Sequence, residues 1–416
     1  MKFEDYNLEP ELTNGIAKLG FKRPTDIQYK TIPSILKGED VLAVAQTGTG
    51  KTAAFAIPII NLLHQNRLNE RRRDGLKCII MVPTHELAIQ ITKVVKKLAR
   101  ETRVKVMGIY GGVDQDPQIA QLAKRVDIVV ATPGRLFDLI SQGHLIIHRV
   151  TTLVLDEADH MLDLGFIKDI QDLTRKLPNK RQTLFFSATI NPKIKKLAYS
   201  LIRQNAIRIQ ISPKDPITKN VNHAVAFMEM DAKRFFLEQV INENPDSKIL
   251  VFVRTKVRAE RVKKAMERAK IESETIHSDK EQEDRNHVMG RFRHGHTKVL
   301  IATDITARGI DIPDVQMVIN YDLPDKAENY VHRIGRTGRG KKRGDAISFC
   351  SPNEKKYLEE IEAFIYTKVT VLKVAKGDEK EARILSNSND RRLDMLMEEI
   401  EESENRNRKR KKRSKK

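Results

Sequence analysis

The sequence predicts an α/β protein with two parallel-sheet domains in tandem and a helical, then disordered, basic C-terminal tail. Three observations predict this fold. The 416 residues are enough for two or three domains of about 150 residues each. Short continuous apolar runs recur in both halves and alternate with stretches of helical spacing, which is typical of a parallel sheet covered on both faces. Residues 210–223, with two prolines and no clear periodicity, separate the halves.

The apolar runs are the expected strands. In the first half they are residues 41–45, 78–83, 104–110, 127–132, 152–157 and 183–189. In the second half they are residues 248–253, 274–278, 298–304, 315–322 and 345–350. Longer stretches with helical spacing, such as residues 87–100, connect them. We therefore predict one domain at 1–209, a linker at 210–218, a second domain at 219–366 and a tail at 367–416.

The tail carries much of the positive charge. The chain has 76 Lys and Arg against 56 Asp and Glu, a net charge of +20, and residues 406–416 contain nine basic and no acidic residues. We expect one helix at 390–405 and disorder beyond it. The rest of the chain remains basic, which favours a polyanion as partner.

Membrane and secreted classes are not expected. No run approaches the roughly 18 apolar residues that span a bilayer, and the N-terminus lacks the basic and apolar pattern of a signal peptide. Cys78 and Cys350 are far apart, each within an apolar run. Two buried thiols in a reducing cytoplasm are therefore expected, rather than a disulfide framework or a thiolate metal site.

A phosphate-binding loop follows the first expected strand. Residues 43–52, AVAQTGTGKT, fit the P-loop pattern except that Ala45 stands where the first glycine is usual. The glycines let the backbone wrap a polyphosphate, the lysine reaches the outer phosphates, and the threonine hydroxyl can bind Mg²⁺. A glycine-rich turn without a ligand is the alternative. The nucleotide-binding residues expected here are Gln46, Thr47, Gly48, Thr49, Gly50, Lys51 and Thr52.

A P-loop needs an acidic partner, and Asp156 and Glu157 end an apolar strand. Alone, such a pair is usually a solvated helix cap. With the P-loop upstream, Asp156 is expected to hold Mg²⁺, partly through water, and Glu157 to deprotonate the attacking water.

Together these features resemble the DEAD-box ATP-dependent RNA helicases, whose namesake tetrapeptide stands at residues 156–159. The resemblance covers about residues 3–366 and implies tandem RecA-like domains, ATP and Mg²⁺ as cofactors, and a cytoplasmic location. It implies RNA-stimulated ATP hydrolysis that drives local unwinding of short duplexes or remodelling of RNA–protein complexes. The two-domain build resembles the bacterial RhlE-like branch.

The resemblance also assigns residues. GFKRPTDIQ at residues 20–28 resembles the adenine-reading motif, so Gln28 would pair with adenine, Phe21 would pack on the ring, and Phe3 is the upstream aromatic. Asp311 would meet the ribose. Ser187, Ala188 and Thr189 would couple hydrolysis to strand separation. The RNA-facing residues would be Pro83, Thr84, Gly111, Gly112, Thr132, Pro133, Gly134, Arg135, Arg254, Thr255, Gln282, Arg285, Thr303 and Gly309.

HRIGRTGR, at residues 332–339, lies in the half opposite the P-loop. Arg336 and Arg339 can project from one side toward the transferring phosphoryl group, where an arginine accelerates the reaction by about 10³–10⁵-fold. Surface salt bridges are their alternative role. Hydrolysis should thus require the two domains to close, which RNA bound across both would favour. By resemblance His332 ties this motif to the carboxylates, which completes a catalytic set with Lys51 and Glu157.

Three positions depart from the family pattern. His85 stands where arginine is usual, so a weaker phosphate donor faces RNA. Ser278 replaces a common glycine, and Gly340 stands where some relatives have an aromatic.

With no tryptophan and 5% aromatic residues, base stacking is scarce. Binding through sugar and phosphate, with little sequence preference, is therefore expected. The tail is expected to tether RNA, although an import signal or a solvated tail fits the same residues.

Two other functions stay open. One is a DNA helicase or translocase, against which the adenine motif and HRIGRTGR argue. The other is a noncatalytic RNA clamp, against which the intact catalytic set argues. The sequence names no partner beyond RNA, and ribosomal precursors and RNA-decay proteins are both candidates.

Overall fold

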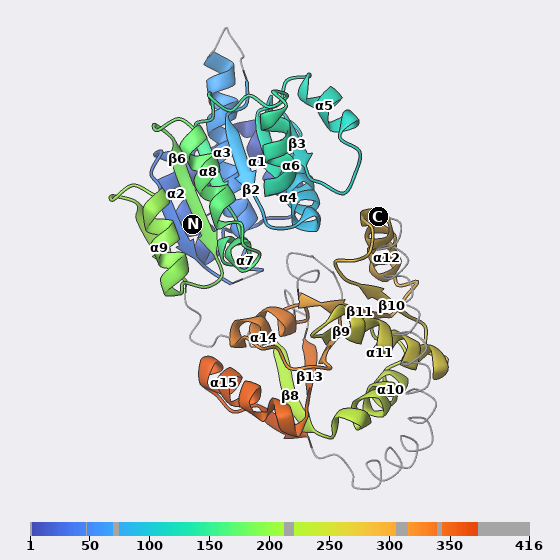
Figure 1. Ribbon diagram of the computed structural model, residues 1–416. Coiled ribbons are helices and arrows are strands. Elements are labelled where there is room, and N and C mark those ends of the chain that lie inside the picture. The colour runs from blue at the N-terminus through green and yellow to red at the C-terminus, as the bar shows by residue number, and fades with distance from the viewer. Residues whose placement is uncertain are drawn as a thin grey trace, which may run out of the picture.

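The computed structural model describes residues 2–46, 48–69, 75–211, 220–304, 315–338 and 343–372. Within them the chain forms two α/β domains, and Figure 1 shows them one above the other. Each domain contains a 7-stranded sheet in which every neighbouring pair of strands is parallel. The predicted fold class is confirmed.

The first sheet has the strand order β3-β4-β2-β5-β6-β1-β7. Its strands are β1 (Val41–Val44), β2 (Cys78–Met81), β3 (Val106–Ile109), β4 (Ile128–Ala131), β5 (Thr152–Leu155), β6 (Gln182–Ser187) and β7 (Ile207–Gln210). Its helices are η1 (Phe3–Tyr6), α1 (Pro10–Lys18), α2 (Asp26–Leu36), α3 (Lys51–Asn69), α4 (His85–Leu98), α5 (Asp116–Leu122), α6 (Pro133–Ser141), α7 (Ala158–Asp163), α8 (Ile167–Lys176) and α9 (Pro192–Leu201).

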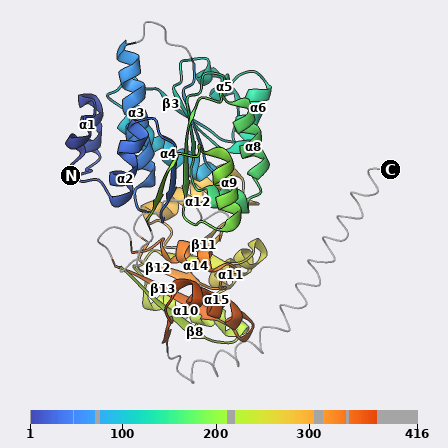
Figure 2. The same cartoon turned by 90° about the vertical axis from the view of Figure 1, so that its left-hand side faces the viewer.

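The core of this domain lies on both faces of the sheet. Alternate residues of a strand point to opposite faces, so Val41 and Ala43 join one apolar cluster and Leu42 joins the other. The first cluster is covered by α1 to α4, and the second by α6 to α9. Figure 2 shows these helices on either side of the strands. Because both faces are covered, the central strands read as continuous apolar runs.

The second sheet has the order β10-β11-β9-β12-β13-β8-β14. Its strands are β8 (Val221–Phe227), β9 (Ile249–Val253), β10 (Ser273–Ile276), β11 (Val299–Thr303), β12 (Met317–Asn320), β13 (Gly344–Cys350) and β14 (Thr370–Leu372). Its helices are η2 (Met230–Ala232), α10 (Lys233–Glu243), α11 (Lys256–Arg268), α12 (Gln282–His294), α14 (Ala327–Ile334), η3 (Pro352–Glu354) and α15 (Lys355–Ile365). Helices α12, α14 and α15 cover one face, and α10 and α11 cover the other.

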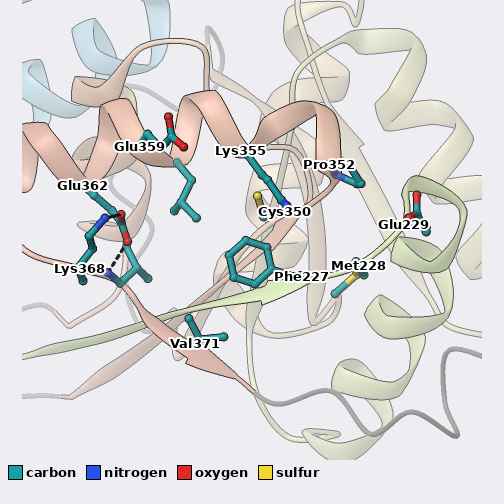
Figure 3. Close-up of a pocket in the computed structure, with 12 residues that line it drawn as sticks. Phe227, Met228, Glu229, Cys350, Pro352, Lys355, Glu359, Glu362, Lys368 and Val371 are labelled. Carbon is teal, nitrogen blue, oxygen red and sulfur yellow. Dashed lines mark hydrogen bonds and ion pairs between the residues drawn. The ribbon is translucent and has the colours of Figure 1, made fainter.

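Strand β14 lies inside the segment that the sequence assigned to the tail. Glu362 on α15 accepts hydrogen bonds from Lys368 Nζ at 2.6 Å and from the backbone N–H of Val369 at 3.0 Å. Figure 3 shows the Glu362–Lys368 pair beside a cavity of about 700 Å³ between α15 and the sheet edge. These bonds lead the chain into β14, which pairs with β8, so the sheet extends past residue 366.

Several predicted features lie outside the described residues. They are Thr47, Gly309, Asp311, Arg339, Gly340, most of the linker at 210–218 and the tail from 373 onward. Among the residues that the structure does describe, no helix has the length and apolar character to cross a bilayer.

Candidate nucleotide and nucleic-acid site

The predicted phosphate loop connects β1 to the N-terminus of α3. Gly48 and Gly50 have φ angles of +80° and +94°, in the left-handed region that residues with a Cβ rarely adopt. Thr49 Oγ1 donates to the carbonyl of Gln46 at 2.7 Å, and Lys51 Nζ donates to the carbonyl of Ala45 at 2.8 Å. The loop is therefore tightly wound, with the Lys51 ammonium drawn over it and the α3 N-terminus beside it, as polyphosphate binding requires.

The adenine-reading motif braces this loop from outside. Gln28 Nε2 donates to the carbonyl of Gly50 at 3.1 Å, and Thr25 Oγ1 donates to the carbonyl of Thr49 at 2.8 Å. Gln28 Oε1 also accepts from the backbone N–H of Thr25. The motif is thus hydrogen-bonded directly to the loop. Its pairing with adenine, and the packing of Phe21 on the base, stay predictions.

The aromatic residues expected beside the adenine lie together. The rings of Phe3 and Phe21 stack with centroids 6.5 Å apart. Phe3 is buried, whereas Phe21 is partly exposed.

Asp156 and Glu157 lie at the carboxyl end of β5. Burial raises the pKa of Asp156 to about 7, although the charge of Lys51 opposes the rise. Burial also acts to raise the pKa of Glu157. Hydrogen bonding to His160 and the charges of Lys51 and Arg336 outweigh burial and lower that pKa to about 2. Glu157 therefore stays ionised at neutral pH.

The backbone at Glu157 is strained. Its φ is +52° and its N–H donates to Asp156 Oδ1 at 3.0 Å. A non-glycine residue in this conformation costs about 1–3 kcal/mol, and such residues cluster at active sites. The surrounding structure therefore holds the glutamate in a fixed orientation.

The residues available to Mg²⁺ fit a hard cation. Asp156 is a buried carboxyl, and Thr52 lies in the first turn of α3, which begins at Lys51. A divalent cation prefers such oxygen ligands and would stabilise the carboxylate.

The predicted coupling segment touches the same acidic motif. Asp159 Oδ2 accepts hydrogen bonds from the backbone N–H of Thr189 at 3.1 Å and from its Oγ1 at 3.2 Å. Ser187 Oγ donates to the carbonyl of Thr189 at 2.7 Å. The acidic motif and residues 187–189 are thus joined directly by hydrogen bonds, and their role in coupling stays a prediction.

Helix α14 brings the second domain to the nucleotide side. Arg336 is buried, and its charge is among the causes that lower the pKa of Glu157. Its Nε donates to the carbonyl of His332 at 3.2 Å. The charge of Arg336, in the second domain, therefore acts on the Glu157 carboxylate of the first domain, and the catalytic roles of both residues stay predictions.

Arg333, in the same motif, has a structural role that the sequence did not show. It is 2% exposed. Its guanidinium donates hydrogen bonds to the side chains of Asp304 and Asn320 and to the carbonyl of Asp322. It thereby fixes α14 to the sheet and positions Arg336.

The residues expected to face RNA gather at the carboxyl ends of the strands. Thr84, Thr132 and Thr255 are the N-caps of α4, α6 and α11. Backbone N–H groups at helix N-termini bind phosphate oxygens. Pro83 and Gly111 follow β2 and β3, Pro133 and Gly134 begin α6, and Thr303 ends β11.

Two of the expected RNA-facing arginines are held by the protein itself. Arg135 donates to the carbonyl of Val113 at 2.8 Å. Arg254 donates to the carbonyl of Leu323 and to Glu354 at 2.9 and 3.1 Å. Arg254 and Thr303 line a common cavity of about 400 Å³ that also includes His160 of the first domain.

The two domains meet through expected RNA-facing residues. His85 Nδ1 lies 3.0 Å from Gln282 Oε1, and Glu86 pairs with Arg285. A Cβ placed on Gly112 would lie 3.2 Å from the Cβ of Gln282. Gln282 and Arg285, on α12 of the second domain, therefore contact α4 of the first domain. Sequence reasoning missed Glu86, although it stands directly after His85 in the same motif.

Comparison with known proteins agrees with this geometry. The DEAD/DEAH box helicase family model matches residues 25–197, and the helicase conserved C-terminal domain model matches residues 232–341. The chain is 38% identical over 398 residues to ATP-dependent RNA helicase CshA of Listeria monocytogenes, covering 96% of this chain and 75% of that protein. It is 37% identical over 393 residues to ATP-dependent RNA helicase DbpA of Bacillus subtilis, covering 94% and 80%.

A solved structure with the same two-domain fold is Saccharomyces cerevisiae Dbp5 bound to RNA and ADP BeF3. It matches with a TM-score of 0.80 at 29% identity, covering 92% of this chain and 99% of that chain. The superposition spans both domains, so the predicted tandem RecA-like architecture is confirmed.

Proposed function

The chain belongs to the DEAD-box family of ATP-dependent RNA helicases, and on that premise we propose that it separates short RNA duplexes locally or remodels RNA–protein complexes. The activity itself is RNA-dependent ATP hydrolysis. The observation that carries the proposal is that the charge of Arg336 helps to lower the pKa of Glu157, because one domain supplies the carboxylate and the other the arginine. Hydrolysis then depends on domain closure, and the RNA-facing residues on both domains link closure to RNA.

The roles of the residues follow from their positions. Lys51 and the N–H groups of the loop hold the phosphates, and Glu157 orients the attacking water and accepts its proton. Arg336 stabilises the charge that develops on the transferring phosphoryl group. Thr52 and Asp156 would hold Mg²⁺, which when bound neutralises phosphate charge. Arg339, His332 and Asp311 keep the roles that the family resemblance gives them.

RNA is bound mainly through sugar and phosphate. The cap threonines and the first turns of α4, α6 and α11 offer backbone N–H groups, which recognise phosphate without reading bases. We propose little sequence preference on this ground. A cytoplasmic location, the RhlE-like branch, and ribosomal precursors or RNA-decay proteins as partners remain proposals from the sequence.

Steady-state ATPase activity tests the proposal. It should be measured without polymer, with single-stranded RNA and with single-stranded DNA, on the full chain and on a chain ending at Leu372. Strong stimulation by RNA alone supports the helicase function, and the difference between chains gives the contribution of the tail. Equal stimulation by DNA would indicate a DNA translocase. Retained RNA remodelling by Lys51→Ala without nucleotide would indicate a noncatalytic clamp.

A further inference from the structure

A cavity of about 490 Å³ opens on the first domain between α4, α5 and the edge strand β3, which lie together in Figure 1. None of its lining residues belongs to the nucleotide loop or to α12. We call it the α4 groove. It is lined by Thr92, Lys93, Lys96, Lys97, Arg100 and Tyr110, among others.

The wall formed by α4 is strongly basic. Lys93, Lys96, Lys97 and Arg100 recur at the spacing of one helix face, and all are exposed. No acidic residue lines the groove, and across the described part of the chain the three lysines have no ion-pair partner. Lys96 and Lys97, in the last turn of α4, complement the helix dipole. The dipole does not explain Lys93 or the cavity, whereas an anionic ligand explains all four charges.

The groove also contains a buried hydroxyl without a partner. Thr92 is 8% exposed, and within the described residues its Oγ1 makes no hydrogen bond. Buried polar groups are normally paired, so an unpaired one at a cavity wall points to a ligand. Gly108 leaves the space open, because a Cβ there would lie 2.7 Å from Thr92 Oγ1. A threonine hydroxyl can both donate to a phosphate oxygen and accept from a ribose hydroxyl.

The groove continues from the residues that face RNA. Tyr110 precedes Gly111 and Gly112, and its ring centroid lies 6.2 Å from that of His85. Gln118 fixes Tyr110 by accepting from its backbone N–H and donating to its carbonyl, at 3.2 and 3.1 Å. Helix α4 starts at His85 and runs 14 residues, about 20 Å at 1.5 Å per residue.

We propose that the α4 groove binds the single-stranded RNA that extends beyond Gly111 and Gly112. The phosphates lie on the α4 cations, and one nucleotide lies against Tyr110 and the Thr92 hydroxyl. The site lengthens the RNA path by a sequence-independent segment. This proposal rests on the proposed function in one respect, which is that the bound polyanion is RNA.

A triple charge reversal tests the proposal, with Lys93→Glu, Lys96→Glu and Lys97→Glu combined. The matched control reverses Lys193, Lys195 and Lys196, three exposed lysines of α9. Binding of fluorescent RNA is measured by anisotropy with a nonhydrolysable ATP analogue, using oligonucleotides of about 8 and about 25 nucleotides. Melting temperatures confirm that both variants fold.

The α4 variant should lose about 10-fold or more in affinity for the long RNA, with the short RNA unchanged. Loss of three phosphate contacts should reduce the slope of log affinity against log salt by about 2. The control should change both affinities by less than about twofold. Thr92→Val, which replaces the hydroxyl by a methyl group, should lower the affinity for the long RNA by a few-fold and leave the affinity for the short RNA unchanged.

Equal losses on both RNA lengths, or the same loss in the α9 control, would overturn the proposal, because net charge would then account for binding. An unchanged Thr92→Val would overturn the hydroxyl contact. Failure of the proposed function gives a different result. In that case no RNA stimulates the ATPase activity of the wild-type protein, while its affinity for RNA still depends on RNA length.

Discussion

Replacing Glu86 by glutamine tests whether the contact between the domains supports RNA-dependent closure. Glu86 on α4 pairs with Arg285 on α12, and Gln282 Nε2 lies 3.4 Å from the same carboxylate. Glutamine keeps the size of the side chain and removes its charge. Because these residues belong to different domains, the change should act on closure and leave the chemistry within the closed state intact.

The expected magnitude follows from burial. The side chains of Glu86 and Arg285 are 8% and 13% exposed. Breaking a fully buried pair costs about 3–5 kcal/mol and an exposed pair about 0–1 kcal/mol. Since glutamine retains a hydrogen-bond acceptor, we expect about 1.5 kcal/mol, which corresponds to roughly tenfold in an equilibrium constant.

ATPase activity as a function of RNA concentration measures this effect. The RNA concentration at half-maximal rate should rise about tenfold, while the rate at saturating RNA falls much less. Asp163→Asn is the matched control, because Asp163 pairs with Lys326 across the domains with side chains 29% and 52% exposed. It should shift the midpoint by less than about fivefold. An unchanged midpoint for Glu86→Gln would refute the role of the pair in closure.

Three further predictions concern the catalytic acids and the second domain. Glu157→Gln should bind ATP and RNA but lose about 10²–10⁴-fold in turnover, measured in single-turnover assays; normal turnover would show that another group acts as the base. The pKa of Asp156 in the folded chain, about 7, lies above its unfolded value. The stability that this group contributes is therefore complete at acid pH and is lost as pH rises through about 7. Without nucleotide or metal, Asp156→Asn should melt higher than wild type at pH 8 and much less so at pH 5, and equal differences at both pH values would contradict the shift. Lys233 is fully buried, and its Nζ donates to Glu354 at 2.5 Å and to the carbonyl of Tyr321 at 2.7 Å. Lys233→Met should therefore lower the free energy of unfolding by about 3–5 kcal/mol. At about 2–4 °C per kcal/mol, calorimetry should then show a fall of about 6–20 °C, against little change for Lys298→Met, whose partner Asp246 is exposed.

Much of the fold was predictable because the signals are local. The central strands of both sheets are covered by helices on both faces, so β1, β2, β5 and β9 appear as uninterrupted apolar runs. The phosphate loop was equally visible, because the glycines and the lysine expected to bind phosphate stand within ten residues of one another. The assignment to a family followed from the order of such short motifs.

Strands near the sheet ends were missed. β7 and β14 lie at sheet edges, and β8 lies beside β14. The residues of β14 are exposed, and two of the four residues of β7 are exposed as well. They lack a continuous apolar run, and their strand conformation depends on pairing with a neighbour rather than on their own sequence.

The sequence by itself predicted which residues would bind phosphate and carry the acidic and basic groups of hydrolysis, because each motif is continuous in the chain. Tertiary structure decided which of these groups meet. It let the charge of Arg336 act on Glu157 across the domains, paired His85 with Gln282 across 197 positions of sequence, buried Lys233 and Arg333, and opened the α4 groove. These contacts join residues from separate elements, and only the packing of complete sheets and helices fixes the distances between them.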